Sequence, residues 1–315
     1  MTAPTVTLSL DQLAPIFAGI GLASPRSLTE LKNDGNAVFR VDLADGSAVV
    51  LKVYDDRFQI VSKREAFAAK LLENVDLPLT RFLLIDETRE RLTQRFSVTN
   101  HLPGDEAFAH RQEPDVVDVY RDMGAALRKL HEVRLPGYGR FDEGVLAPTF
   151  ATNAEAVRER VTYAFAQFRR YAANARLADA LEQEVERDFE VATWSAGATF
   201  AHDDFQPHNV LAQRDASGRL RLSGIVDFGN AFAGDAVSDL AKALFCSEHD
   251  APGSSPFIIE GYGPIDHPDP PRALRFYTLL HRVTMWWWLR HVGILADGEP
   301  SDLVRDLEAM VAEPA

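Results

Sequence analysis

Hydrophobic and polar residues alternate along much of the first hundred positions, which is the pattern of β-strands. Residues 37–43 alternate in this way, Asp45 and Gly46 supply a turn, and residues 48–54 return as a second strand. Two further strands are predicted at residues 82–86 and 92–98. This part of the chain therefore predicts an antiparallel sheet.

One helix is expected inside this strand-rich part, and helices dominate after it. Hydrophobic residues recur every four positions in residues 61–74, and a Leu-Pro-Gly-Asp segment at residues 102–105 then breaks the chain. Beyond the break, residues 116–131 place their hydrophobic side chains on one helical face. Further helices are predicted at residues 154–172, 177–193, 236–245, 272–289 and 301–311.

A strand-rich first third followed by a helical remainder is typical of an α+β protein rather than of a doubly wound sheet. The length of 315 residues is enough for two lobes. We divide the chain into residues 1–100, which hold the sheet and one helix, and residues 101–315.

Composition and charge limit the possible partners. A hydrophobic content of 46% with 25% charged residues argues against extensive disorder. A net charge of −14 speaks against nucleic acid as a ligand and is compatible with a cationic substrate, or simply with a well-solvated surface. No apolar run is long enough to span a membrane, and the N-terminus lacks the basic segment of a secretory signal. The single cysteine, Cys246, excludes an internal disulfide and fits a reducing cytoplasm, where we expect the protein.

The strongest candidate chemistry lies in two short segments joined by a turn at residues 215–218. His202, Asp204 and Asn209 have the spacing H-x-D-x-x-x-x-N, and Asp227 opens an Asp-Phe-Gly triplet. The segments predict a hairpin with acidic residues at its mouth. Together they form the signature set of phosphoryl-transfer kinases. In that chemistry the first Asp accepts the proton of the substrate hydroxyl, while the Asn and the second Asp hold magnesium against the ATP phosphates.

Each piece has a simpler explanation when it is taken alone. A lone Asp-Phe-Gly is usually a turn after a strand, and a lone His-x-Asp is usually a loop. The combination fixes about six residue types at set spacings, which chance rarely produces. The histidines that flank Asp204 allow a metal site of His202, His208 and Asp204, but we expect His202 to be structural.

Lys52 is the one lysine of six that lies within an apolar strand. Its neighbours Leu51 and Val53 point to the opposite face, and a charge inside a strand needs a partner or an anionic ligand. Glu65, in the following helix, is the candidate ion-pair partner, and such a pair positions the ammonium group against nucleotide phosphates. The alternative is a lysine on an edge strand whose ammonium group reaches water.

Other glycine-containing and serine-containing patterns add little. A turn at residues 33–36 contains Gly35 and Asn36, whose backbone amides are candidates to cover ATP phosphates, although such a turn can simply connect two strands. The chain has no G-x-x-x-x-G-K-[ST] loop. Gly19 and Gly21 lack the third glycine of a dinucleotide fingerprint, and no serine lies in a G-x-S-x-G context.

Taken together, these residues resemble the aminoglycoside phosphotransferase and choline kinase superfamily, the small-molecule relatives of protein kinases. The matching order spans most of the chain, from Lys52 and Glu65 through the break after residue 101 to the catalytic hairpin and residues 234–241. The resemblance implies a protein-kinase-like bilobal α+β fold. Residues 1–100 would form a nucleotide-binding N-lobe and residues 101–315 a C-lobe that carries the hairpin and substrate-binding helices.

The resemblance also implies roles for particular residues. Asp204 would be the catalytic base, with Asn209 and Asp227 as ligands of Mg²⁺. The adenine of ATP would bind the backbone of Asn100, His101 and Leu102, in the cleft between the lobes.

One position departs from the family pattern, because this chain has Asp203 where the family usually has glycine. An extra carboxylate beside the base would raise the proton affinity of Asp204 or contact a substrate amine. The fold is not put in doubt, since protein kinases accept a bulky residue there.

The motifs predict an ATP-dependent O-phosphotransferase and leave the small-molecule acceptor open. The net charge, Asp203 and acids of the variable helical region such as Asp266 and Asp269 favour an aminoglycoside or amino sugar. Three consecutive tryptophans fan out by about 100° each on a helix, so one or two belong to the core and another can stack on a sugar ring. The candidate substrate residues are Asp203, Glu248, Asp250 and Trp287.

Two alternatives remain for the function. A metabolite kinase, such as a homoserine kinase, has the same motifs. A nucleotide-binding pseudokinase scaffold belongs to another class, and the presence of Lys52, Asp204 and Asp227 speaks against it.

Overall fold

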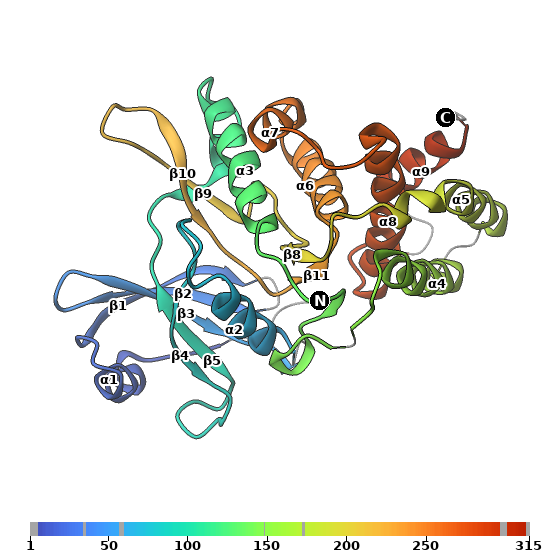
Figure 1. Cartoon of the computed structure of the whole chain (residues 1–315). Helices are drawn as coiled ribbons and strands as arrows, with labels where there is room; N and C mark the ends of the chain where they lie inside the picture. Colours follow the sequence, from blue (N-terminus) through green and yellow to red (C-terminus); the bar gives the residue numbers. More distant parts are fainter. Residues whose placement is uncertain are drawn as a thin grey trace.

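The structure combines a five-stranded sheet with a mainly helical part, as Figure 1 shows. It is a computed structural model, which describes residues 6–33, 36–56, 60–147, 149–171, 174–296 and 301–312. The strand-rich first third and helical remainder confirm the predicted α+β class. The predicted division at residue 100 stays a prediction, although the chain does leave the last strand of the sheet at Asn100.

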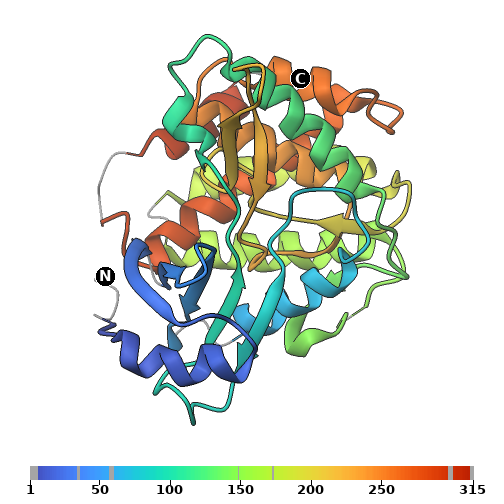
Figure 2. The ribbon, with the colours of Figure 1, turned by 90° about the vertical axis from the view of Figure 1, so that its left-hand side faces the viewer.

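The sheet is antiparallel throughout, with the strand order β1-β2-β3-β5-β4. Its strands are β1 (Pro25–Asn33), β2 (Ala37–Leu43), β3 (Ala48–Val53), β4 (Phe82–Asp86) and β5 (Phe96–Asn100). Alternation along β2 and β3 buries every second residue on one face, where helix α1 (Leu10–Gly19) covers them. In Figures 1 and 2, α1 lies at the end of the molecule farthest from the helical part. The residues between, including Lys52, therefore face helix α2 (Val61–Leu71).

Among its described residues, the remainder of the chain holds seven α-helices and six short strands, which form two three-stranded sheets, β10-β9-β6 and β7-β11-β8. The helices are α3 (Val116–His131), α4 (Asn153–Tyr171), α5 (Ala175–Asp188), α6 (Ala236–Asp250), α7 (Ser255–Tyr262), α8 (Pro270–His291) and α9 (Asp302–Ala312). The strands are β6 (Asp105–Glu106), β7 (Gly139–Arg140), β8 (Thr199–Ala201), β9 (Val210–Arg214), β10 (Leu220–Ile225) and β11 (Phe232–Gly234). No described helix has both the length and the apolar character that crossing a membrane requires.

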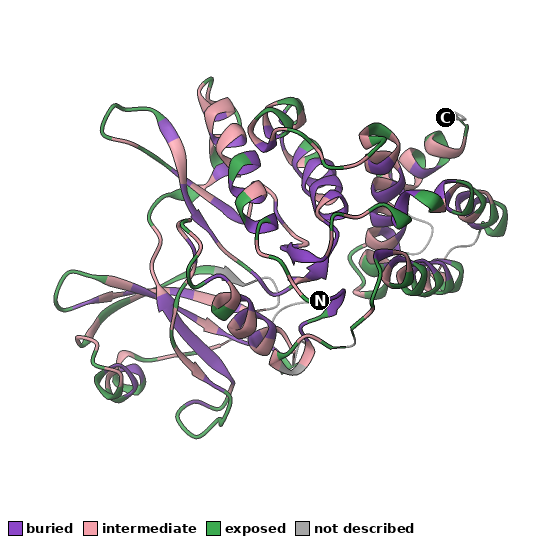
Figure 3. Cartoon of the chain, in the orientation of Figure 1, coloured by how far each residue is buried: buried purple, intermediate pink, exposed green. Residues whose placement is uncertain are grey.

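Two hydrophobic cores support this part. One core joins α3, α6 and α7 to the strands β8–β11, and the other joins α4, α5, α8 and α9. Figure 3 shows α6, β8 and β11 largely buried at the centre of the molecule. Helix α6 therefore offers a rigid surface on which the loop after β8 can rest.

Helices α3 and α7 approach closely because glycines face each other's backbone. A Cβ atom on Gly124 of α3 would lie 2.0 Å from the carbonyl oxygen of Ile258, and one on Gly261 would lie 1.9 Å from that of Arg121. Neither position can hold a larger side chain without separating the helices.

Several boundaries differ from the predictions. Strand β5 starts at Phe96 rather than at the predicted Leu92. Leu92 is hydrophobic because it is buried, but it lies in the loop before the strand. Helix α5 ends at Asp188 and continues as a 3₁₀ helix to Thr193. Helix α6 runs beyond its predicted end. Helix α7 was not predicted, because it has only 8 residues and contains a proline and a glycine.

Candidate active site

The predicted catalytic hairpin is formed by β9 and β10, which pair antiparallel. The loop that follows β8 carries Asp204, and Asp227 follows β10. The backbone N–H of Val226 donates to the carbonyl of Asn209 at 3.0 Å, so the two acidic segments lie side by side. Lys52 of the sheet meets them, because its Nζ lies 3.3 Å from Oδ1 of Asp227. The tertiary fold thus brings residues 175 positions apart into direct contact.

Neutral amides hold the Asp204 carboxylate in place. Nδ2 of Asn209 lies 3.0 Å from one carboxylate oxygen and 2.8 Å from the backbone carbonyl of Asp204. Nε2 of Gln206 lies 3.1 Å from the other oxygen. Burial raises the pKa of Asp204 above its ordinary value, Lys242 acts against this effect, and Asp227 adds to it. A carboxylate that is oriented by amides and has a raised pKa is suited to accept a proton.

Asp239 of α6 anchors the backbone that leads to Asp204. Its carboxylate accepts the N–H groups of His202 and Asp203, each at 2.8 Å, and lies 3.0 Å from Nε2 of His131. Burial alone would raise the pKa of Asp239, but the hydrogen bond from His131 and the nearby positive charge outweigh it and lower the pKa. The loop is therefore fixed to the central helix by a charged group that is itself buried.

The histidines beside Asp204 serve the fold. His202 is fully buried and its Nε2 lies 3.2 Å from the carbonyl oxygen of Val226. His208 stacks on Phe108 and its Nδ1 lies 2.7 Å from a Glu106 oxygen. Within the described ranges no group of three His, Cys, Asp or Glu residues has the arrangement of a metal site. His202 is therefore part of the core, and its structural role stays a prediction.

Lys52 lies between two carboxylates. Its Nζ is 2.5 Å from Oε1 of Glu65, and the hydroxyl of Tyr54 donates to the other Glu65 oxygen at 2.6 Å. The side chains of Lys52 and Glu65 are only 14% and 5% exposed, and β3 lies inside the sheet rather than at its edge. Burial lowers the pKa of Lys52, but Asp227 and Glu65 raise it more, so the ammonium group stays charged. This geometry excludes the alternative that Lys52 lies on an edge strand with its ammonium group in water.

The connection between the sheet and the helical part contains the three residues expected to bind adenine. Oδ1 of Asn100 accepts the N–H of Arg81 at 2.6 Å, the ring of His101 lies 3.4 Å from Nη1 of Arg40, and the Leu102 side chain lies beside Gly224. No backbone hydrogen bond within the described chain uses the N–H or C=O of His101 or Leu102. These groups are available to a planar hydrogen-bonding ligand.

The turn expected to cover phosphates is only partly described. Gly35 lies outside the described residues. Asn36 is described, and its side-chain oxygen accepts the N–H of Asp55 at 3.0 Å, which ties the start of β2 to the end of β3.

Asn209 and Asp227 have oxygen atoms that fit a hard cation such as Mg²⁺. The amide nitrogen of Asn209 is used by Asp204, while its amide oxygen accepts no hydrogen bond from the described residues. The Asp227 side chain is 44% exposed, and its backbone has a φ of 62°. The donor set therefore fits the metal that was predicted.

The four candidate substrate residues have different surroundings. Asp203 adjoins the base, and its Oδ2 lies 3.1 Å from Nζ of Lys242. The Glu248 carboxylate accepts the N–H groups of Gly253 and Ser255, which orders the turn between α6 and α7. Asp250 is mostly buried, and burial raises its pKa.

Of the three tryptophans, Trp286 and Trp287 belong to the core and Trp288 is 43% exposed. The ring of Trp287 makes an edge contact with Tyr163 of α4, with ring centres 5.7 Å apart. This arrangement confirms that one or two of them are core residues.

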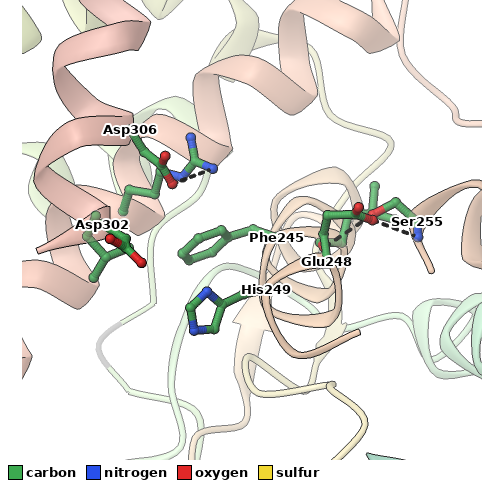
Figure 4. A pocket seen from close by; sticks show the side chains of 9 residues that line it. Phe245, Glu248, His249, Ser255, Asp302 and Asp306 are labelled. Carbon is green, nitrogen blue, oxygen red and sulfur yellow. Dashed lines mark hydrogen bonds and ion pairs between the residues drawn. The ribbon is translucent and has the colours of Figure 1, made fainter. Parts of the chain in front are cut away.

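A pocket of about 390 Å³ opens beside α6, between α8 and α9. Figure 4 shows Phe245 and His249 extending from α6 toward Asp302 and Asp306 of α9. Three carboxylates line the pocket, and Asp306 pairs with Arg282 at 3.2 Å. The acids of α9 were not among the predicted site residues, because a surface helix shows no signal for a pocket that α6 and α8 complete.

The model of the phosphotransferase enzyme family matches residues 28–276, which is most of the chain. The chain belongs to this family. As a member it is a small-molecule kinase, which transfers phosphate to a hydroxyl group. No curated protein matches the sequence.

Solved structures of aminoglycoside phosphotransferases share the fold of this phosphotransferase. A thermostable mutant of APH(4)-Ia in a ternary complex with ADP and hygromycin B has a TM-score of 0.71 at 17% identity, over 97% of this chain and 98% of that chain. The ADP-bound APH(2'')-Ib has a TM-score of 0.63 at 16% identity, over 96% and 97%. A streptomycin-ATP complex of APH(2'')-IIa has a TM-score of 0.61 at 15% identity, over 98% and 97%. At these identities the likeness establishes the bilobal α+β fold.

Sequence reasoning missed several residues that support the site. Lys242, Asp239 and Tyr54 each contact a predicted site residue directly. One signal was available, because Asp239 and Lys242 are three positions apart on a helix and must share a face.

Proposed function

We propose that this phosphotransferase moves the γ-phosphoryl group of ATP to a hydroxyl of a small molecule, with Asp204 as the base. The observation that carries the proposal is the meeting of Lys52, Asp227 and Asp204 at the junction of the sheet and the hairpin. A buried ammonium group, an exposed carboxylate and an oriented base are the parts that in-line phosphoryl transfer requires.

The nucleotide would lie against the sheet. Lys52, held by Glu65, would bind its phosphates, and the free backbone groups of His101 and Leu102 would bind adenine. ADP or ATP is named in complexes of the structures that share the fold, which supports the same ligand here. Asn209 and Asp227 would hold Mg²⁺, which neutralises phosphate charge when bound.

The transfer step uses the chain's own base. The acceptor oxygen attacks the γ-phosphorus, the bond between that phosphorus and the β–γ bridging oxygen breaks, and ADP leaves. The hydroxyl proton passes to Asp204, whose carboxylate Asn209 and Gln206 orient. Lys52 stabilises the charge that develops on the leaving phosphate.

For the acceptor we propose an aminoglycoside or amino sugar that extends into the pocket beside α6. Lys242 and His249 are seven residues apart on α6, which is about 10 Å of helix axis. An acceptor with its hydroxyl at Asp204 and its far end in the pocket must therefore span two or more sugar rings. Glu248, Asp302 and Asp306 outweigh the one guanidinium group there and would attract ammonium groups. Hygromycin B and streptomycin are named in structures that share the fold.

One observation favours a second acceptor class, a small molecule with a carboxylate such as homoserine. Arg160 of α4 lies within electrostatic reach of Asp203 and pairs with no carboxylate among the described residues. Among the described residues, its guanidinium group makes hydrogen-bond contacts with Ser238 and His281. An anionic acceptor would supply the missing partner.

A panel of acceptors with ATP tests the proposal. ADP release is followed with aminoglycosides, amino sugars and homoserine, and phosphorus NMR identifies the phosphorylated product. For a polycationic acceptor, kcat/KM falls as salt rises, while KM for ATP changes little. Homoserine, which is zwitterionic, gives a flatter response. Absence of turnover with every acceptor and of nucleotide binding would overturn the proposed function.

Variants of the pocket separate the two acceptor classes. Asp306→Asn should raise KM for an aminoglycoside several-fold and leave homoserine unaffected. Arg160→Gln should do the reverse. Asp179→Asn is the matched control, because Asp179 pairs with Arg169 on the exposed side of the same helical part. If Asp306→Asn and Asp179→Asn give equal KM values, the pocket does not bind the acceptor.

A further inference from the structure

Helix α2 lies between the sheet and the segment that leads into α4, as Figure 1 shows. Its apolar side chains pack with the helical part of the molecule. Phe67, Ala68 and Leu71 belong to the core that joins α3, α6 and α7 to β8–β11, whereas the core of β2, β3 and α1 contains no described residue of α2. By its packing, α2 is therefore a member of the helical part, although the chain places it between two strands of the sheet.

Toward the sheet, α2 presents Glu65. One oxygen of its carboxylate lies 2.5 Å from Nζ of Lys52, and the other accepts the hydroxyl of Tyr54 at 2.6 Å. Lys52 lies in β3, and Tyr54 follows that strand directly. The pair of Lys52 and Glu65 therefore links the sheet to a helix that is packed with the other part of the molecule.

Arg64, the residue before Glu65, fixes α2 to the helical part. Its Nε and Nη2 donate to Oδ1 of Asp142 at 2.9 and 2.6 Å, and its Nη1 donates to the carbonyl oxygen of Gly229 at 3.4 Å. The Arg64 side chain is only 8% exposed. The planar guanidinium group has donors in a fixed fork, so it makes these bonds at the same time. Arg64 thus ties α2 to the 3₁₀ helix Asp142–Gly144 and to the glycine of the Asp-Phe-Gly triplet.

Two further contacts show how closely α2 fits these segments. The rings of Phe67 and Phe141 meet edge to face, with their centres 5.0 Å apart. A Cβ atom on Gly229 would lie 2.9 Å from Cγ1 of Val61 and 3.7 Å from Oε1 of Glu65. Helix α2 therefore rests directly on the Asp-Phe-Gly turn.

We propose that Arg64 is a positioning residue for the nucleotide, because it holds α2 where Glu65 can orient Lys52. Consecutive helical residues point about 100° apart, so one orientation of the helix aims Arg64 at the helical part and Glu65 at the sheet. A rotation or shift of α2 that breaks the pair of Arg64 and Asp142 also moves the Glu65 carboxylate. The inference rests on the proposed function, since it concerns the lysine that would bind the phosphates. The motif pattern of the sequence singles out Glu65 and not Arg64.

The consequence falls on the phosphates of the nucleotide rather than on adenine. Nζ of Lys52 also lies 3.3 Å from Asp227, so a displaced Glu65 leaves the ammonium group to that carboxylate. A displacement of about 1 Å at a positioned group can cost about 100-fold in rate. Arg64 acts one residue further away, so we expect its loss to lower ATP affinity and kcat about tenfold.

The experiment measures the affinity of two variants for a non-hydrolysed ATP analogue and for adenosine by isothermal titration. Arg64→Gln should raise Kd for the analogue about tenfold and leave Kd for adenosine at the wild-type value. Asp142→Ala should have the same selectivity and a smaller effect, because the bond from Arg64 to the Gly229 carbonyl remains. Equal losses for the analogue and for adenosine would overturn the proposal.

Arg272→Gln is the matched control. Nε of Arg272 lies 2.9 Å from Oδ1 of Asp188, and its Nη2 lies 3.5 Å from the carbonyl oxygen of Arg187. In each pair one side chain is largely buried, Arg64 at 8% and Asp188 at 7% exposed. Arg272 therefore makes the same kinds of contact, but it joins α8 to α5. Its removal should lower Tm and leave Kd for the ATP analogue unchanged, and an equal rise of this Kd in both variants would contradict the inference.

A double-mutant cycle shows whether Arg64 acts through Glu65. In the Glu65→Gln background, Arg64→Gln should cost nothing further in affinity for the ATP analogue, because the carboxylate that it positions is already absent. An additional loss equal to that of the single variant would mean that Arg64 supports the fold in general, and the inference is wrong. Where Arg64→Gln does not fold, Asp142→Ala takes its place in the cycle.

Hydrogen–deuterium exchange of the ligand-free protein separates this inference from the proposed function. The amides of α2 should exchange faster in Arg64→Gln than in wild type, and at the wild-type rate in Arg272→Gln. If wild type binds no nucleotide but this difference is present, the proposed function has failed and Arg64 still positions α2. If wild type transfers phosphate but Arg64→Gln changes neither the exchange nor the affinity for the ATP analogue, the inference alone has failed.

Discussion

Two largely shielded lysines lie beside the candidate active site, and each pairs with a carboxylate. Lys52 meets Glu65 where we propose that the nucleotide binds, and Lys242 meets Asp203 beside the proposed base. Their exposed fractions are similar, 14% and 17%. The difference is in what each pair serves. The ammonium group of Lys52 is directed toward Asp227 and the proposed phosphate site. The ammonium group of Lys242 donates to the backbone carbonyl of Asp203, next to the proposed base.

The two pairs also arise differently. Lys52 occupies a strand position whose neighbours are buried on the other face, so alternation alone marks it as an exception. Lys242 lies on a helix, where a polar residue is ordinary, and its spacing from Asp239 is the one hint that the sequence offers. The comparison teaches that charge in a strand interior is a readable signal, whereas charge on a helix acquires its role only from what packs against that face.

The largest expected effect comes from Asp204, the proposed base, which follows the Asp203 that Lys242 contacts. Asp204→Asn should lower kcat by about 10²–10⁴-fold while ATP still binds, because only proton removal and acceptor orientation are lost. Steady-state kinetics with isothermal titration of a non-hydrolysed ATP analogue measures both quantities. Turnover near the wild-type level would remove Asp204 from the role of base.

Lys52→Met tests the role of the first lysine pair in binding the nucleotide phosphates. Turnover should fall about 10²-fold, because the charge that stabilises the leaving phosphate is gone. ATP should bind more weakly, and adenosine should bind as before. Thermal unfolding provides the control: equal losses of affinity for ATP and adenosine, with a lower Tm, would indicate a folding defect instead of a lost phosphate contact.

Asp227→Asn tests whether the same carboxylate serves both Lys52 and a metal. The half-saturating Mg²⁺ concentration should rise about tenfold, since a charged oxygen ligand of a hard cation is replaced by a neutral one. Turnover is titrated with Mg²⁺ at saturating ATP, with Asp118→Asn as the matched control, because Asp118 is a similarly exposed carboxylate that pairs with Arg121 on α3. An unchanged titration in Asp227→Asn would exclude this carboxylate as a ligand.

Tyr54→Phe should have the smallest effect of these variants, and it isolates the contribution of the group that orients Glu65 in the first lysine pair. It removes the hydroxyl that donates to Glu65 and leaves the lysine pair in place. The free energy of unfolding should fall by about 1 kcal/mol, and KM for ATP should rise a few-fold. Tyr138→Phe is the control, because that hydroxyl contacts Ser195 at 2.7 Å, away from Lys52. A rise in KM for ATP in both variants would show that the effect is not specific to Glu65.

Much of the site follows from spacing along the chain. The predicted site residues of this segment flank one hairpin, whose turn and strands are local features: His202, Asp204 and Asn209 precede β9, and Asp227 follows β10. The pairing of Lys52 with Glu65 was also expected, because a charge inside a strand needs a partner and Glu65 lies in the following helix. The start of β5 was placed too early, because the burial of Leu92 depends on a loop folding back onto the sheet.

By itself, the sequence determined the α+β class, most of the longer strands and helices, the hairpin and the family. These depend on periodicity and on residues close together in the chain, for which local backbone geometry is sufficient. Only the tertiary structure decided which side chains line the region where we propose that the acceptor binds. Lys242, Arg160 and the acids of α9 come from three helices that are separated by long stretches of chain. Their meeting depends on how two hydrophobic cores pack these helices, and packing has no linear signature.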